Sequence, residues 1–103
     1  MTVMYKQPGL PAKMVNIRGS LKDLQTLVGG YIESISLNCG NSVCHDIVCL
    51  CDEDGRAKGL RKNIRLGNIP YDILGNVVFL GARYEYFESL TKEECALISE
   101  VYA

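Results

Sequence analysis

Residues 43–51 constrain the fold more than any other part of the sequence, because apolar side chains occupy both alternating sets of positions. Successive side chains of a β-strand point to opposite faces of a sheet. One face would carry Val43, Ile47 and Cys49, and the other would carry Val48 and Leu50. A strand that is apolar on both faces needs a packed layer on each side, so we predict a central strand in a sheet covered on both faces.

Shorter strands are predicted towards the two ends of the chain. Residues 2–6 and 13–18 flank the sequence Pro8-Gly9-Leu10-Pro11, whose prolines and glycine favour a turn over a strand interior. Residues 77–81 are uniformly apolar or small and indicate a buried strand. Residues 83–87 are expected to extend the sheet at an edge or as a hairpin arm.

The middle of the chain gives weaker signals. Residues 31–37 alternate loosely as a strand, with one face made of Tyr31, Ile35 and Leu37 and with Glu33 as the exception. Residues 38–41 are expected to turn. Residues 52–55 predict a tight turn, because an Asp-Gly pair tolerates a positive φ, and a partner strand is expected at 56–60. Residues 61–76, with two glycines and a proline, predict a loop or a short helical turn.

A first helix is predicted after Ser20, whose side chain can accept from the backbone N–H of Asp23. The Asp23 carboxylate also favours the positive end of the helix. Gly29-Gly30 supplies the stop. The apolar face of this helix consists of Leu21, Leu24 and Val28, with Leu27 beside them.

The last element carries the strongest helix signals. Thr91 and Glu94 have the spacing of a capping box, and Leu90 and Cys95 have the spacing of a hydrophobic staple. Its apolar face is expected to contain Cys95, Ile98 and Tyr102.

These elements predict an α+β fold: a small, mostly antiparallel sheet with two short helices packed on it. A chain of 103 residues is the size of one domain, so we expect residues 1–103 to form a single domain. Two helices leave one sheet face thinly covered, which favours a homo-oligomer.

The charge counts against direct nucleic-acid binding. The chain carries 11 Lys and Arg against 12 Asp and Glu, and its net charge is −1. A protein that coats nucleic acid by releasing counterions is usually basic, so direct nucleic-acid binding is not expected. No apolar run approaches the ~18 residues that cross a bilayer, and the N-terminus lacks the apolar stretch of a signal peptide. We therefore expect a cytoplasmic protein with no membrane partner.

The chain contains five cysteines, which raises the question of a metal site, but their spacing argues against one. The strongest candidate set is Cys39, Cys44, His45, Cys49 and Cys51. On a strand, Cys49 and Cys51 would share a face about 7 Å apart while Cys44 points to the other face. His45 and Asp46 would also point to opposite faces, so they cannot form a relay. We expect free thiols buried as small hydrophobic groups, including Cys95, and no metal or cofactor.

The basic residues are concentrated in residues 56–65, which contain Arg56, Lys58, Arg61, Lys62 and Arg65 and no acidic residue. Glutamates dominate the chain from Tyr84 onward. One interpretation is two solvated faces that neutralise each other. The other is an anion site in or near 56–65, suited to a nucleotide phosphate or an acidic partner surface.

Three blocks of the sequence resemble a known family of small domains. They are Leu27-Val-Gly-Gly-Tyr-Ile-Glu33, then Cys51-Asp-Glu-Asp-Gly-Arg-Ala-Lys-Gly-Leu60 with Asn63, and Phe87-Glu-Ser-Leu-Thr-Lys-Glu93. The family is one of unknown function, encoded by phages, prophages and mobile elements, mostly of Gram-positive bacteria. Arg61 stands where the family tends to have proline, and Tyr71-Asp-Ile-Leu-Gly75 departs from its usual pattern. The block positions carried over as candidates are Gly29, Gly30, Tyr31, Glu33, Gly59, Leu60 and Asn63.

This resemblance implies a non-enzymatic accessory protein, a counter-defence factor that acts by binding. Its partner would be a host defence protein, bound through the glutamate-rich C-terminal helix and residues 83–87, or a signalling nucleotide. A nucleotide would be held by residues 56–65 with Tyr31 or Tyr84. The alternatives are a small enzyme that uses Cys44 or Cys51 with His45, and a DNA-associated regulator. The candidate binding residues are Arg56, Lys58, Arg61, Lys62, Asn63, Arg65, Tyr31, Glu33, Tyr84 and Tyr86.

Overall fold

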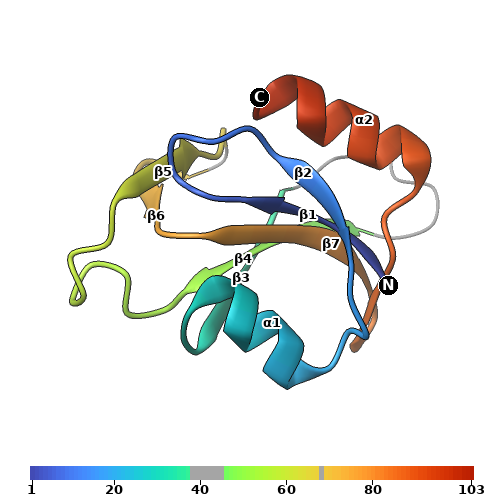
Figure 1. The fold of residues 1–103 in the computed structure, drawn as a ribbon, viewed down its shortest axis with the longest axis horizontal. Helices are drawn as coiled ribbons and strands as arrows, with labels where there is room; N and C mark the ends of the chain where they lie inside the picture. The colour runs from blue at the N-terminus through green and yellow to red at the C-terminus, as the bar shows by residue number, and fades with distance from the viewer. Residues whose placement is uncertain (38–45, 68) are drawn as a thin grey trace.

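The computed structural model describes residues 1–37, 46–67 and 69–103. The elements, labelled in Figure 1 where there is room, are β1 (Thr2–Lys6), β2 (Lys13–Asn16), α1 (Leu21–Val28), β3 (Ile32–Ser36), β4 (Asp46–Asp52), β5 (Lys62–Arg65), β6 (Asp72–Leu74), β7 (Val77–Arg83), β8 (Tyr86–Glu88) and α2 (Lys92–Val101). The fold is α+β, as the sequence predicts.

One antiparallel sheet organises the molecule. Its strands lie in the order β2-β1-β7-β4-β3, and β8 pairs with the last residues of β7. Residues 47–52 of β4 are all buried, so the central strand expected from residues 43–51 is confirmed over the part that the structure describes. Residues 38–45, including the expected turn at 38–41, lie outside the described residues.

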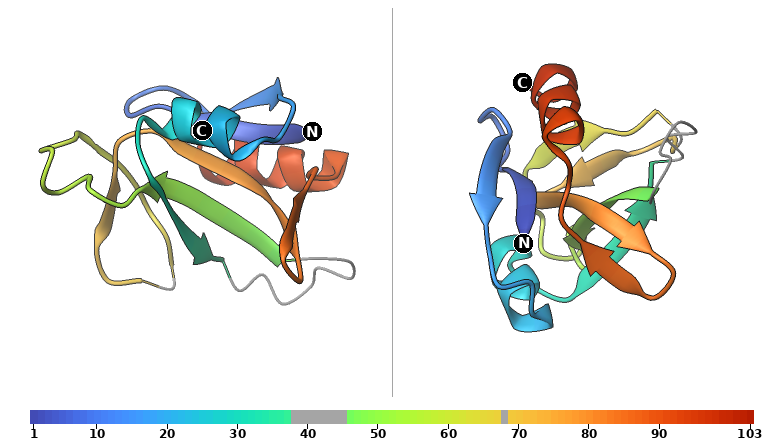
Figure 2. Two further views of the ribbon diagram at one scale, coloured as in Figure 1. Left: turned by 90° about the horizontal axis from the view of Figure 1, so that it is seen from below. Right: turned by 90° about the vertical axis from the view of Figure 1, so that its right-hand side faces the viewer.

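Each face of the sheet is covered by its own layer. In Figures 1 and 2, α1 and α2 lie on opposite sides of the sheet. The α1 side packs Leu24 and Val28 against Leu50, Val78 and Leu80. The α2 side contains a second cluster, which includes Cys49, Cys51, Phe79, Cys95, Ile98, Ile64 and Ile73. The last two side chains come from the small β5–β6 sheet, which therefore helps α2 to cover this face.

The predicted helix caps are confirmed. Ser20 accepts from the backbone N–H of Asp23 at 3.1 Å, and Gly29 ends α1 with a φ of 93°. Thr91 and Glu94 form both hydrogen bonds of the capping box of α2. Leu21, which the pattern places on the buried face of α1, is exposed instead.

Residues 56–76 differ from the sequence prediction. A strand at 56–60 is wrong, because residues 53–59 form consecutive turns closed by hydrogen bonds such as Leu60 N to Gly55 O. The positive φ in this segment belongs to Gly59, at 65°, and not to Gly55. A loop over 61–76 is also wrong, since β5 and β6 pair as an antiparallel sheet. These two strands have four and three residues, too few to show a period.

Neither helix has the length and apolar character that a membrane span requires, among the residues that the structure describes.

Candidate functional site

The candidate binding residues lie at two opposite ends of β7. Residues 61–65 precede the start of β7, where Gly75 N donates to Arg61 O at 2.7 Å. Tyr84 and Tyr86 follow its other end. The seven residues of β7 separate the two groups by roughly 20 Å. Tyr84 therefore lies far from residues 56–65, and the two cannot hold one ligand together. Tyr31 lies near the basic segment, because its backbone carbonyl accepts from the backbone N–H of Glu53.

Lys58 is engaged by the fold. Its ammonium group lies 2.6 Å from the Asp52 carboxylate and also donates to the carbonyl of Gly29. The Asp52 side chain is only 1% exposed. Burial alone would raise the pKa of Asp52, but the hydrogen bonds from Lys58 and from the backbone N–H of Asp54, together with the Lys58 charge, hold this pKa below its usual value.

Three further basic side chains have partners. Arg65 lies 3.1 Å and Lys62 3.5 Å from the Asp72 carboxylate, and the hydrogen bond from Arg65 is the main reason why the pKa of Asp72 is lowered. The guanidinium of Arg56 lies over the ring of Tyr71, 5.4 Å from its centroid. Arg61 has no carboxylate partner among the described residues, and its guanidinium lies against Gly9. A phosphate group at 56–65 would compete with Asp52 and Asp72 for most of these cations.

Asn63 is used to hold the fold together. Its amide nitrogen donates to the carbonyls of Lys6 and Gly75, at 2.9 and 2.7 Å, and its oxygen accepts from the buried Lys6 ammonium group at 2.9 Å. Both N–H donors of the amide are thus occupied by links from β5 to β1 and to the turn before β7. The position predicted for a ligand therefore joins the small sheet to the large one.

In the Leu27–Glu33 block, Gly29 and Gly30 are each required to be glycine, for different structural reasons. Gly29 adopts the left-handed conformation that caps α1. A side chain on Gly30 would place its Cβ 2.6 Å from the Lys58 nitrogen and 2.7 Å from an Asp52 oxygen. The blocks 27–33 and 51–60 consequently meet at the Lys58–Asp52 ion pair. A shallow cavity of about 300 Å³ next to this pair is lined in part by Gly29, Lys58, Leu60 and Arg61.

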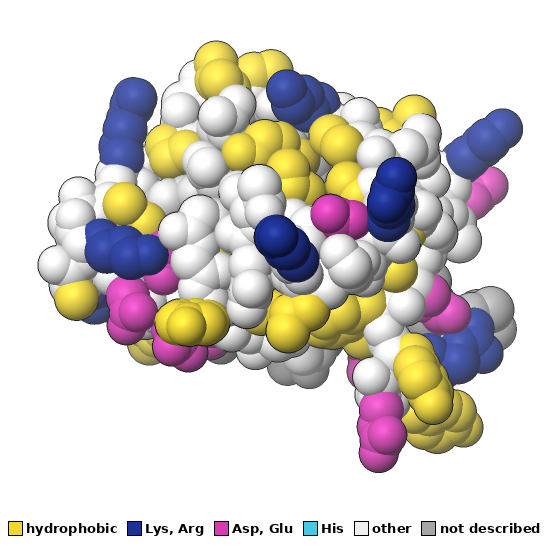
Figure 3. All heavy atoms as spheres, turned by 60° about the horizontal axis from the view of Figure 1, so that its bottom comes forward, with side chains coloured by type: hydrophobic (Ala, Val, Ile, Leu, Met, Phe, Trp, Pro, Cys, Tyr) yellow, Lys and Arg dark blue, Asp and Glu magenta, His cyan; other side chains and the backbone are white. Residues whose placement is uncertain are grey.

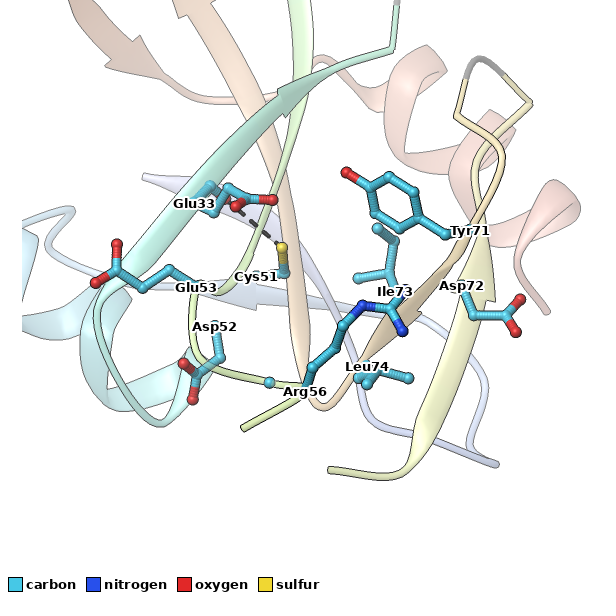
Figure 4. Close-up of a pocket in the computed structure, with 10 residues that line it drawn as sticks. Glu33, Cys51, Asp52, Glu53, Arg56, Tyr71, Asp72, Ile73 and Leu74 are labelled. Carbon is cyan, nitrogen blue, oxygen red and sulfur yellow. Dashed lines mark hydrogen bonds between the residues drawn. The ribbon is translucent and has the colours of Figure 1, made fainter. Parts of the chain in front are cut away.

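A smaller cavity of about 230 Å³ lies between the β3–β4 edge of the large sheet and the β5–β6 sheet. Its lining includes Glu33, Cys51, Arg56, Tyr71 and Ile73. In Figure 4, Glu33 and Tyr71 point towards each other across the cavity, Cys51 lies between them, and Arg56 reaches up from the 53–59 turns beside Tyr71. The sequence indicates Glu33 and Arg56 but not Tyr71, whose segment lacks any periodic pattern and reaches this cavity only because β6 pairs with β5.

The Cys51 thiol in this cavity is protonated at neutral pH. Burial, followed by the nearby charges of Glu33 and Asp52, raises its pKa to about 11. The thiol points to the backbone carbonyl of Glu33, with a sulfur–oxygen distance of 3.8 Å. Burial also raises the pKa of Cys49 and Cys95, and Cys49, Cys51 and Cys95 are free, as predicted.

The metal and nucleophile candidates of the sequence fall only partly within the structure. Cys39, Cys44 and His45 lie outside the described residues. Within the described parts of the chain, no group of three or more His, Cys, Asp or Glu side chains has the arrangement of a metal site.

The opposite end of β7 presents an aromatic hairpin. Arg83 pairs with Tyr86, so Tyr84 and Glu85 form a two-residue connection between β7 and β8. Tyr84 has a φ of 54°, and its side chain is 97% exposed; Tyr86 is 74% exposed. The guanidinium of Arg83 donates to Glu88 at 3.2 Å across the hairpin. In Figure 3, hydrophobic and acidic side chains stand out from the lower right of the molecule, where β7 ends.

Comparisons with known proteins place the whole chain in one family. No curated protein and no solved structure matches the chain. A model of a domain of unknown function, DUF3846, matches residues 1–103. The resemblance to a family of small domains of unknown function is thereby confirmed, and the chain belongs to the DUF3846 family.

Proposed function

We propose that this protein is a non-enzymatic accessory protein of a phage or mobile element, which acts in the host cytoplasm by binding a host defence protein through the β7–β8 hairpin. The observation that carries the proposal is the conformation of Tyr84, a non-glycine residue with a φ of 54° and a side chain 97% exposed.

The left-handed conformation of Tyr84 costs free energy. A side chain in the left-handed region costs about 1–2 kcal/mol relative to a glycine there. A two-residue turn with a positive φ at its first central position normally has glycine at that position. The Tyr84 ring is 97% exposed, so packing against the described residues offsets little of this cost. Strained residues of this kind concentrate at functional sites.

The side chains of the hairpin indicate the kind of surface that it fits. Tyr84 and Tyr86 offer two exposed rings, and tyrosine is among the residues that contribute most to binding energy in protein interfaces. Glu85 lies between them in the turn, whereas Glu88 on β8 is paired with Arg83. A complementary surface has an apolar pocket with a basic rim.

Two observations favour this reading over the alternatives. The protonated, buried thiol of Cys51 is a poor nucleophile at neutral pH, which counts against an enzyme built on that residue. The pairing of Lys58, Lys62 and Arg65 with Asp52 and Asp72 counts against phosphate capture by residues 56–65.

Photo-crosslinking in host cells tests the proposal. A photoreactive residue replaces Glu85, which leaves both tyrosines in place, and a matched control carries it at Lys22, on the exposed face of α1. We expect one host protein to be crosslinked from position 85 and not from position 22. That protein is then purified and its affinity for the variants is measured.

The affinities separate the two mechanisms of binding. Tyr84→Asn keeps a residue that tolerates the left-handed region but removes the ring, and it should weaken the complex by about 30-fold or more, the loss expected of an interface hot spot. Arg61→Ala with Lys62→Ala should leave the affinity unchanged. The opposite pattern, with loss of binding in the double variant only, would refute the hairpin interface in favour of the basic segment.

A further inference from the structure

We infer that the cavity between β3–β4 and β5–β6 binds a flat heterocycle with two adjacent N–H donors, a guanine-type base, through Glu33, Arg56 and Tyr71. This cavity lies at the other end of β7 from the hairpin, so the inference does not rest on the proposed function.

The Glu33 carboxylate provides the acceptor. It has no ion-pair or hydrogen-bond partner among the described residues, and in Figure 4 it faces the cavity. Its two oxygens match two neighbouring N–H groups on one edge of a ligand, and hydrogen bonds to a charged group are stronger than those between neutral groups.

Arg56 provides N–H donors that no residue in the described part of the chain uses. Asp52 and Asp72 both lie near the cavity, but they pair with Lys58, Lys62 and Arg65. Arg56 instead lies over the Tyr71 ring and has no carboxylate partner among the described residues. Its N–H groups are therefore available to oxygen or ring-nitrogen acceptors of a ligand, in the way that arginine recognises guanine.

The walls of the cavity suit an uncharged aromatic ring. Tyr71 supplies a surface for stacking, and Cys51 and Ile73 supply a protonated thiol and an apolar side chain. The volume of about 230 Å³ is below the range of roughly 300–1,000 Å³ typical of drug-sized ligands, which favours a single base over a whole nucleotide.

The carboxylate discriminates between the bases. Guanine presents two adjacent donors on its Watson–Crick edge and two acceptors on the next edge. Adenine and cytosine place an acceptor beside their amino group, and uracil places acceptors on both sides of its single donor. These acceptors would face the negative charge of Glu33, so the three other bases should bind more weakly.

Titration of the whole protein with nucleosides, followed by amide NMR shifts and calorimetry, tests the inference. Guanosine should shift the signals of Glu33, Cys51 and Tyr71 and bind at least tenfold more tightly than adenosine, cytidine or uridine. Guanosine monophosphate should bind about as tightly as guanosine, because Lys58, Lys62 and Arg65 are already paired with Asp52 and Asp72. Methylguanidine, a cation with the same pair of donors, should bind more weakly because Arg56 repels it.

A matched pair of variants assigns the acceptor. Glu33→Gln exchanges one acceptor oxygen for a donor and should weaken guanosine binding at least tenfold. Glu53→Gln makes the same change of charge at the residue that follows β4. Glu53 also lines the cavity, but Figure 4 shows its carboxylate pointing away from Glu33 and Tyr71, so this variant should change binding less than twofold. Unfolding curves of both variants verify that the fold is intact.

Three outcomes would overturn the inference: no shift at saturating guanosine, equal affinity for guanosine and adenosine, or equal loss in the two glutamine variants. A guanosine-containing single-stranded oligonucleotide distinguishes the two sources of the base. Equal binding of the nucleoside and the oligonucleotide assigns the cavity to the base in either form, and tighter binding of the oligonucleotide assigns it to single-stranded nucleic acid.

Discussion

Gly30 has a specific steric role, because it allows Lys58 to reach Asp52 over the backbone. Gly30→Ala would bring a Cβ to 2.6 Å from the Lys58 nitrogen, so the ion pair must shift and leave a buried carboxylate without its main partner. We expect a loss of about 1–3 kcal/mol in the free energy of unfolding, measured with urea. Gly67→Ala is the control, since nothing lies within 4 Å of its added Cβ. Equal stability of the two variants would contradict the steric role.

Asp52 should also make the stability depend on pH. Its pKa is lower in the folded protein than in the unfolded chain, so the stabilisation that it provides is present above the unfolded pKa and is lost as the pH falls through the folded one. Asp52→Asn removes this contribution. We expect the variant to be less stable than the parent at about pH 6 but to lose less of its melting temperature on acidification to about pH 2. Parallel melting-temperature profiles would show that Asp52 does not cause the dependence.

At the scale of elements, the turn between β7 and β8 should favour glycine over alanine, which is the reverse of their usual order in stability. Glycine usually destabilises a protein relative to alanine, because it has more conformational freedom in the unfolded chain. At position 84 the φ of 54° penalises an alanine side chain but not glycine, so Tyr84→Gly should be about 1 kcal/mol more stable than Tyr84→Ala in urea unfolding. If the alanine variant is the more stable one, the turn does not have this conformation in solution.

The elements also show which parts of the fold the sequence reveals. The helix ends were predictable because their signals are local: Ser20 and Thr91 each bond to a backbone N–H three residues away. The β5–β6 sheet was not, because it depends on distant partners. Asn63 reaches Lys6, which is 57 positions away in the sequence, and Ile64 and Ile73 become buried only against the large sheet. The same holds for the cavity: Glu33 was identifiable from its local sequence block, whereas Tyr71 reaches the cavity only through the pairing of β6 with β5.

At the scale of the whole molecule, β7 keeps the two proposed sites apart. The hairpin lies at one end of this buried, rigid strand and the cavity near the other, roughly 20 Å away, and they share no residue. Changes at positions so far apart usually have additive effects. Tyr71→Leu should therefore weaken guanosine binding at least tenfold without altering the affinity for the partner protein, and Tyr84→Asn should do the reverse.

The double variant completes this comparison. Tyr71→Leu with Tyr84→Asn should show the product of the two single effects within about twofold, and saturating guanosine should change the affinity of the parent protein for its partner by less than twofold. Both affinities are measured by calorimetry on the same preparations. A larger change would mean that the ligand alters the hairpin through β7 or β4, because these paired strands connect the cavity edge to the base of the hairpin. The bound base would then regulate partner binding, and the two sites would be allosterically coupled.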